Sequence, residues 1–139
     1  MEELKYLLDK FGFVKQPQVD NDFQEIESLI GFHLPEDYKY YLNNYKPFDD
    51  SIGKQYVVLY SIDDLFEMNK PGTLDEWYTY TVQIGNNGAS EAIGIKFWEL
   101  NNYKVVIAQY IQNIDDQIEI GTSFTDMLKR LDKEIEWFN

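Results

Sequence analysis

The chain has 139 residues, of which 44% are hydrophobic and 17% aromatic, and it contains no cysteine. This length suits one domain, and the abundance of apolar residues argues against intrinsic disorder. The lack of cysteine excludes disulfide and thiolate chemistry. No apolar run reaches the roughly 20 residues of a membrane span, and the start, MEELKYLL, lacks the features of a secretory signal. We therefore expect one domain over residues 1–139, cytoplasmic and without a membrane partner.

Acidic residues outnumber basic ones by 25 to 12, which gives a formal net charge of −13. A field of this sign repels the phosphates of nucleic acids and anionic lipid, and it attracts basic proteins. The charge therefore predicts no nucleic-acid partner and suits a basic protein partner. Plain solubility is the simpler explanation of an acidic surface, and composition alone favours it.

Two helices are predicted first, by apolar residues at helical spacing. These residues are Leu4, Leu7, Leu8 and Phe11 in the first helix, and Phe23, Ile26, Leu29 and Ile30 in the second. Gly12 is expected to end the first helix. The second is expected to begin near residues 20–22 and to end at Gly31 in a left-handed cap.

The stretch IGFHLPEDYKYYLNNY, residues 30–45, predicts a tight turn followed by a third helix. Phe32 and Leu34 are apolar anchors of the turn. Pro35 suits the first helical turn, because its missing N–H would have no partner there, and the following acids favour the positive end of the helix dipole. The predicted buried face of this helix consists of Tyr38, Tyr41, Leu42 and Tyr45.

From residue 52 onward the pattern is that of strands separated by turns. Strands are predicted at KQYVVLY, WYTYTVQIG, EAIGIKFWEL, YKVVIAQYI and IEIG. SIDDLFEMNK predicts a short helix with Ser61 and Asp64 at capping-box spacing, and NNG predicts a hairpin turn. Ser123 is expected to cap a final helix whose apolar side consists of Phe124, Met127, Leu128, Leu131, Ile135 and Phe138.

Short turns rather than crossover helices join these strands, which favours antiparallel pairing. We therefore predict the α+β class: a single domain in which an antiparallel β-sheet meander carries N-terminal helices and a C-terminal helix packed on it. If one hairpin strand is an exposed edge of the sheet, it can pair with the same strand of a second copy. The expected state is therefore a monomer or a weak homodimer.

The chain has no recognisable catalytic or metal-binding motif. His33 is the only histidine, and in a turn between two helices such a residue is more often partly exposed than catalytic. The glycines of IGNNGASEAIG lie between two strands and open no helix, as a phosphate cradle requires. We therefore predict no catalytic residue, no metal, no cofactor and no enzymatic activity.

Adjacent carboxylates occur in three pairs: Asp49–Asp50, Asp63–Asp64 and Asp115–Asp116. Acid–base hydrolysis needs two carboxylates in different environments across a cleft, whereas neighbours of this kind are expected in exposed turns and helix caps. DDQIE also lacks the pattern of a calcium loop, and a fortuitous calcium site is the less favoured alternative there.

The segment IESLIGFHLPEDYKYYLNNY resembles the signature of the SUKH superfamily (Smi/Knr-like), which includes fungal regulators of cell-wall synthesis and many bacterial immunity proteins. VQIGNNGASEAIGIKF and EIGTSFTDMLKRL resemble two further family segments, in the family's order. The sequence departs from the pattern at NNYKPFDD, where an Asn-Gly pair is frequent, and at Glu91 or Ala92, where an aspartate is frequent. The matching positions of the first segment are Glu27, Gly31, Leu34, Pro35, Asp37, Tyr38 and Leu42.

The resemblance implies a SUKH-like, non-enzymatic binding protein. Bacterial members are commonly immunity proteins that neutralise a toxin, often a nuclease, and a basic toxin domain would suit the charge of −13. We therefore expect this partner to bind an acidic-aromatic surface on loops and on the short helix. The candidate residues of the acidic-aromatic surface are Asp49, Asp50, Asp63, Asp64, Glu67, Glu76, Trp77 and Tyr78.

Two other function classes stay open. One is a regulatory or scaffold module that binds a cellular protein, as the fungal relatives suggest. The other is an enzyme, which would need a concave polar pocket with perturbed carboxylates. Each aspartate of the acidic-aromatic surface has the alternative of a cap or solvated turn, and Trp77 and Tyr78 have that of core packing.

Overall fold

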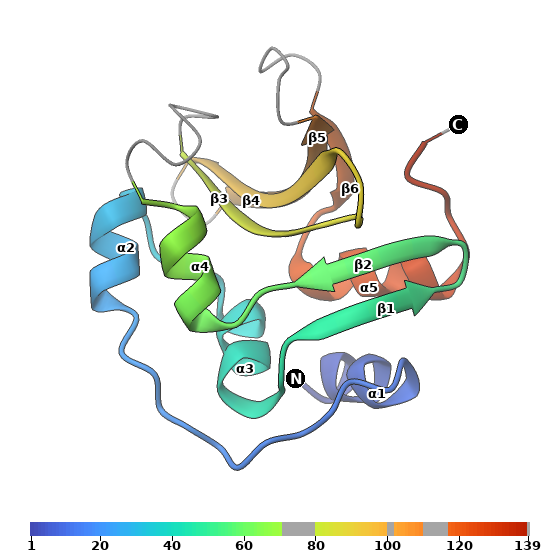
Figure 1. Cartoon of the computed structure of the whole chain (residues 1–139), viewed down its shortest axis with the longest axis horizontal. Coiled ribbons are helices and arrows are strands. Elements are labelled where there is room, and N and C mark those ends of the chain that lie inside the picture. Colours follow the sequence, from blue (N-terminus) through green and yellow to red (C-terminus); the bar gives the residue numbers. More distant parts are fainter. Residues whose placement is uncertain (71–79, 100–101, 110–116, 139) are drawn as a thin grey trace.

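The computed structural model describes residues 1–70, 80–99, 102–109 and 117–138 (Figure 1). The helices are α1 (Glu2–Lys10), α2 (Gln24–Ile30), α3 (Glu36–Asn44), α4 (Ile62–Met68) and α5 (Phe124–Asp132). The strands are β1 (Phe48–Ile52), β2 (Gln55–Leu59), β3 (Thr81–Asn86), β4 (Glu91–Glu99), β5 (Asn102–Gln109) and β6 (Ile118–Gly121).

The strands form one antiparallel sheet in chain order, from β1 to β6. This order confirms the predicted α+β class with an antiparallel meander. The β1–β2 hairpin pairs along its length, but β2 and β3 pair only where Val58 meets Asn86 and Leu59 meets Gly85. The sheet therefore has two parts joined at a short crossing, and Figure 1 shows β1 and β2 below the curved strands β3 and β4.

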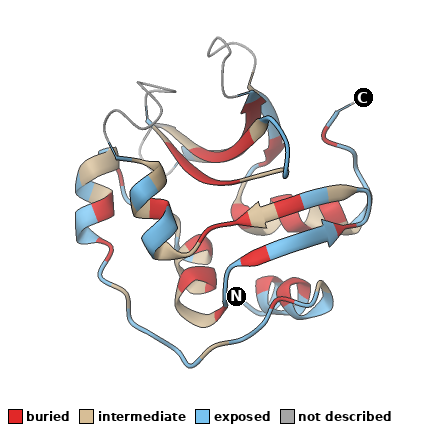
Figure 2. Ribbon diagram, in the orientation of Figure 1, coloured by how far each residue is buried: buried red, intermediate tan, exposed pale blue. Residues whose placement is uncertain are grey.

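The core lies between the sheet and the helices. α5 contacts α1, α3, β5 and β6, and Figure 2 shows buried residues along these elements. The rings of Tyr38 and Tyr41 of α3 each lie 5.3 Å from the ring of Phe124 of α5. Aromatic contacts of this kind add to the free energy gained from burial. The predicted buried face of α3 is confirmed in full, since Tyr38, Tyr41, Leu42 and Tyr45 are all buried.

The predicted helix caps are present. Gly31 ends α2 with a φ of +87°, and the side chains of Ser61 and Ser123 accept backbone N–H groups at the starts of α4 and α5. The start of α2 was predicted too early: the helix begins at Gln24, where Asp22 Oδ1 accepts the backbone N–H at 2.9 Å. Short polar side chains thus accept backbone amides at the starts of α2, α4 and α5, whereas α1 and α3 begin without a side-chain cap.

The predicted apolar side of the last helix is wrong beyond Asp132. The backbone N–H groups of Glu134 and Ile135 bond to the carbonyls of Leu131 and Arg130, and Glu134 has a φ of +58°. These bonds form a Schellman cap, which is usually made by glycine and was therefore not predicted. After this cap Ile135 and Phe138 are exposed, and Trp137 is buried instead.

Strand β1 was not predicted, because Asp and Ser have low strand propensity. Asp49 and Asp50 were expected in an exposed turn, and they lie instead on this edge strand, still exposed. The strand forms because β2 pairs with it and because Phe48 and Ile52 are buried. Asp50 Oδ1 accepts the backbone N–H of Ser51 at 2.7 Å. A charged edge whose N–H is already bonded opposes the addition of another strand, which argues against dimerisation here.

The crossing of β2 and β3 depends on Gly85. A Cβ atom at this position would lie 1.9 Å from the carbonyl oxygen of Val58, whereas one at Gly31 would meet nothing within 4 Å. We expect Gly85→Ala to lower the free energy of unfolding by about 3 kcal/mol or more, because the backbone must separate. Gly31→Ala should cost about 1–2 kcal/mol, the strain of a left-handed alanine. Urea denaturation of both variants tests this, and equal losses would contradict it.

Candidate functional site

The acids of α4 are exposed. Asp63 and Asp64 lie in the first turn of the helix, and the backbone N–H of Asp64 bonds to Ser61 Oγ at 3.2 Å. Glu67 is exposed as well, but its Oε1 lies 2.8 Å from Lys70 Nζ. The charge of Glu67 is thus partly neutralised, and Asp63 and Asp64 are the stronger candidates for contact with a basic partner.

Asp49 of β1 lies beside an aromatic residue, Tyr56, that is not among the predicted site residues. The hydroxyl of Tyr56, on β2, donates a hydrogen bond to Asp49 Oδ1, and this bond raises the pKa of Tyr56. The residue is 42% exposed, and its ring lies against Gly88 in the β3–β4 turn. In β2 the buried residues are Val57 and Leu59, which leaves Tyr56 on the outer face. The run YVVLY has no polar residue that would have marked this face in the sequence.

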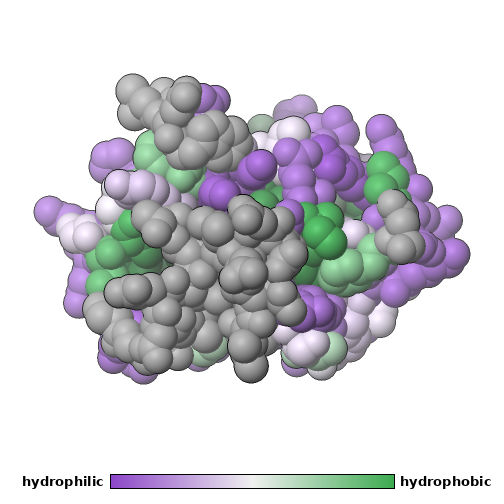
Figure 3. All heavy atoms as spheres, turned by 90° about the horizontal axis from the view of Figure 1, so that it is seen from above, coloured by the Kyte–Doolittle hydropathy of each residue, from purple (hydrophilic) through white to green (hydrophobic). Residues whose placement is uncertain are grey.

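The structure brings Asp49 together with Tyr56, whereas Asp50, the next residue of β1, projects to the opposite face of the strand. Asp63 and Asp64 lie on the next helix. Figure 1 shows α4 beginning shortly after the end of β2. On the face shown in Figure 3, hydrophilic residues cover much of the described surface and hydrophobic residues form separate patches. The other three predicted members of the acidic-aromatic surface, Glu76, Trp77 and Tyr78, lie outside the described residues.

A groove of about 780 Å³ lies between α2, the turn before α3 and the facing ends of β4 and β5. Its volume is in the range of small-molecule and side-chain binding pockets. Its aromatic wall includes Phe32 and Phe97, whose rings stack at 5.1 Å, and Tyr103, whose ring lies 5.6 Å from Phe97. The other lining residues are Asn21, Asp22, Phe23, Gln24, Glu27, Ser28, Gly31, His33 and Lys39.

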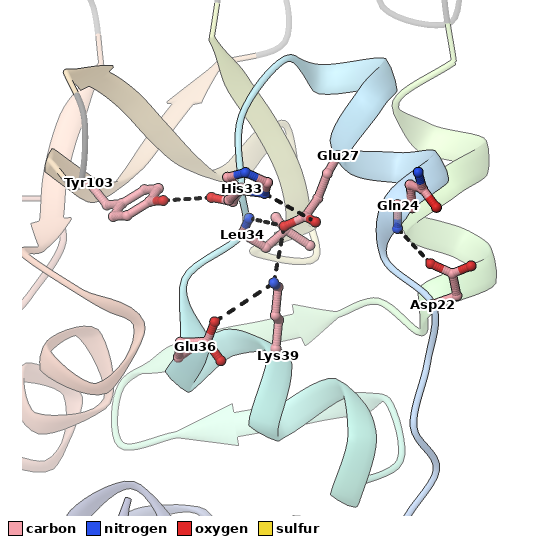
Figure 4. A network of polar contacts seen from close by, with 8 residues as sticks. All are labelled: Asp22, Gln24, Glu27, His33, Leu34, Glu36, Lys39 and Tyr103. Carbon is pink, nitrogen blue, oxygen red and sulfur yellow. Dashed lines mark hydrogen bonds and ion pairs between the residues drawn. The ribbon is translucent and has the colours of Figure 1, made fainter.

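The carboxylate of Glu27 forms the polar centre of the groove (Figure 4). Its Oε2 accepts the backbone N–H of Leu34 at 2.6 Å and lies 3.1 Å from Lys39 Nζ. Its Oε1 lies 3.4 Å from His33 Nδ1. Only 13% of the Glu27 side chain is exposed, against 85% of the His33 side chain. Glu27 thus joins α2 to the turn and to α3.

Burial alone would raise the pKa of Glu27. The hydrogen bond from the Leu34 amide, assisted by Lys39 and His33, outweighs that effect, and the pKa lies below its ordinary value. The carboxylate is therefore ionised at neutral pH, and the donors around it stabilise the charged form.

His33 is an exposed turn residue, as predicted. Its carbonyl oxygen accepts the hydroxyl of Tyr103 at 2.6 Å, which ties the turn to β5. Within the described ranges, no group of three or more His, Asp or Glu side chains could hold a metal ion. None of the described helices is long and apolar enough to cross a membrane.

Asp37 makes a second link between helices. Its Oδ2 accepts the backbone N–H of Thr125 at 2.9 Å and the Thr125 hydroxyl at 2.8 Å. The first turn of α3 is thereby fixed to the first turn of α5. The helix dipole alone was expected to favour the acids of this turn. The contact with Thr125 could not be predicted, because 88 residues separate the partners.

Comparison with family models matches residues 19–130 to the SMI1 / KNR4 family (SUKH-1). The chain therefore belongs to this family, which confirms the SUKH resemblance. The matched range runs from before α2 into α5 and leaves out α1. Comparison with curated proteins gives no match.

The family positions Glu27 and Asp37 have structural functions, and Glu27 can be tested by its pH dependence. We expect Glu27→Gln to lower the free energy of unfolding at neutral pH by about 2 kcal/mol. A hydrogen bond to a charged acceptor contributes about 1.5–3 kcal/mol, and Lys39 would lose its main partner. Because folding lowers the pKa of Glu27, its contribution is complete above the ordinary value of 4.5 and is lost as the pH falls through the folded value.

The difference between wild type and Glu27→Gln should therefore be constant near neutral pH and shrink below about pH 4.5. Glu36→Gln is the matched control, because it removes the same charge from a carboxylate that lies 3.8 Å from Lys39 and is 84% exposed. Such an exposed pair contributes little, so this variant should be close to wild type. Urea denaturation across pH would contradict the assignment if the Glu27→Gln difference did not change with pH.

Proposed function

We propose that this SUKH-family chain is a non-enzymatic, cytoplasmic immunity protein that neutralises a basic toxin domain through its acidic-aromatic surface. The observation that carries the proposal is that a member of this family, with a net charge of −13, exposes its paired aspartates on β1 and α4. An acidic inhibitor of this kind speeds the encounter with a basic toxin and covers the surface that would meet phosphate.

Asp63 and Asp64 are the strongest acidic members. Within the described part of the chain, neither carboxylate takes part in an ion pair, and both lie at the positive end of α4. The helix dipole favours negative charge at this position, and both side chains are exposed to a partner. Charged groups of this kind mainly supply on-rate and selectivity.

Aromatic anchors would supply the rest of the affinity, because buried aromatic residues dominate the energetics of many interfaces. Tyr56 is the described candidate, since it is exposed between Asp49 and the β3–β4 turn. Glu76, Trp77 and Tyr78 complete the proposed surface. Tyr56 is thus an aromatic member of the acidic-aromatic surface in addition to the predicted residues.

The first experiment is a capture from lysate of the source organism with this chain as bait, followed by a growth test of each captured protein. We expect a basic protein that is toxic when expressed alone and harmless when this chain is co-expressed. Washing with about 500 mM instead of about 50 mM salt should weaken capture, because salt screens exposed charges. Capture of cellular proteins that are not toxic would support a regulatory or scaffold module instead.

Neutralising Asp63 and Asp64 tests the surface itself. We expect Asp63→Asn with Asp64→Asn to lower the affinity for the captured toxin about tenfold at low salt and to reduce its salt dependence. The matched control is Glu2→Gln with Glu3→Gln, which removes two acids from the first turn of α1. Isothermal titration calorimetry should show near wild-type affinity for the control. Equal affinities of both double variants would remove α4 from the interface.

A further inference from the structure

We propose that the groove beside α2 binds an arginine side chain of the protein partner, with the guanidinium at Glu27 Oε1. This inference builds on the proposed function, but it concerns a different surface from the acidic-aromatic one. The other contacts of Glu27 in this groove stabilise the fold, and the proposal adds a binding pocket to them.

The two oxygens of Glu27 are used unequally. Oε2 accepts the Leu34 amide at 2.6 Å and lies 3.1 Å from Lys39, whereas Oε1 has the longer contact of 3.4 Å with His33. A carboxylate accepts about four hydrogen bonds, so Oε1 retains capacity for another donor. The His33 side chain is 85% exposed, so it can rotate into solvent without loss of packing. A guanidinium can replace it and bond in the plane of the carboxylate.

The walls of the groove fit the apolar stem and flat head of arginine. Phe32, Phe97 and Tyr103 form one aromatic side. On the other side, Lys39 Nζ already lies 5.3 Å from the ring centroid of Phe23, which shows that a cation is accommodated at this wall. Arginine stacks on aromatic faces more readily than lysine does.

The charges of the groove also favour a cation. Glu27 and Asp22 line it, and Glu36 stands close by, 3.8 Å from Lys39. Lys39 lines the groove as well and is paired with Glu27 and Glu36, so the lining keeps one more negative than positive charge: Asp22 and Glu27 against Lys39. The net field of the chain has the same sign. An anionic ligand would meet these carboxylates, so electrostatic complementarity selects a basic residue of the partner.

The test uses a small probe and does not need the toxin. N-acetyl-arginine amide is titrated into the ¹⁵N-labelled full chain, and its neutral analogue N-acetyl-citrulline amide serves as the charge control. We expect saturable shifts of the backbone amides of Gly31, His33 and Leu34 with a Kd on the order of 1 mM, the range for a ligand of this size. Citrulline should bind at least about tenfold more weakly, because it has no charge for Glu27.

A groove-filling variant locates the site. Ser28 is exposed on α2 and lines the groove, so Ser28→Phe should abolish the shifts without disturbing Glu27. Ser90→Phe, at an exposed position in the β3–β4 turn, is the matched control and should bind like wild type. Unchanged arginine binding in Ser28→Phe, equal binding of citrulline, or no saturable shifts would overturn the proposal. Shifts that depend on protein concentration alone would assign the groove to a second copy of the chain and overturn it as well.

The outcome separates the two proposals. If the groove binds arginine and the captured proteins include no toxin, the pocket stands and the immunity function fails. If a toxin is captured and Ser28→Phe binds it as tightly as the wild type does, the immunity function stands and the arginine pocket fails.

Discussion

The carboxylate of Glu27 is the constraint on which the rest of the architecture depends. It satisfies the backbone N–H of Leu34 in a turn that must reverse the chain between α2 and α3, and it holds Lys39 one turn into α3. An unsatisfied buried amide in that turn would cost about 1–3 kcal/mol. With the turn fixed, α3 presents Asp37 to the start of α5, and its tyrosines reach the core. The position of α5 against β5 and β6 follows from these contacts.

The residues that identify the family are therefore largely those that make the fold. Glu27 and Gly31 form the turn, and Asp37 joins α3 to α5. Family membership consequently establishes the architecture. The choice of partner depends on residues that make few contacts within the fold. Asp63 and Asp64 belong to that group, because their exposed carboxylates make no described ion pair, and Oε1 of Glu27 belongs to it in part. A scaffold built this way can change its partner without changing its turn.

Sequence patterns predicted the helices and strands that are determined by neighbouring residues in the chain. Helical spacing and capping side chains located the helices, and alternating β-branched residues located most strands. Sequence reasoning failed where a partner distant in the chain decides the outcome. FDDSI becomes β1 only because β2 pairs with it, and the cap at Glu134 uses a residue that rarely adopts a positive φ. The groove could not be predicted, because Tyr103 meets the turn at His33 from 70 residues away.

The distribution of acids connects the fold with the proposed function. Some carboxylates are consumed internally: Glu27 supports the turn, Asp37 the α3–α5 contact, and Asp126 the start of α5. These carboxylates contribute to the formal charge, but their hydrogen bonds and neighbouring cations reduce the electrostatic potential that a partner meets. The exposed aspartates of α4 and β1 make no described ion pair, so their charges reach a partner within a Debye length of about 8–10 Å. A basic partner is thus guided toward the exposed acids, while selectivity requires contacts that net charge cannot supply, such as stacking on Tyr56 or a guanidinium at Glu27.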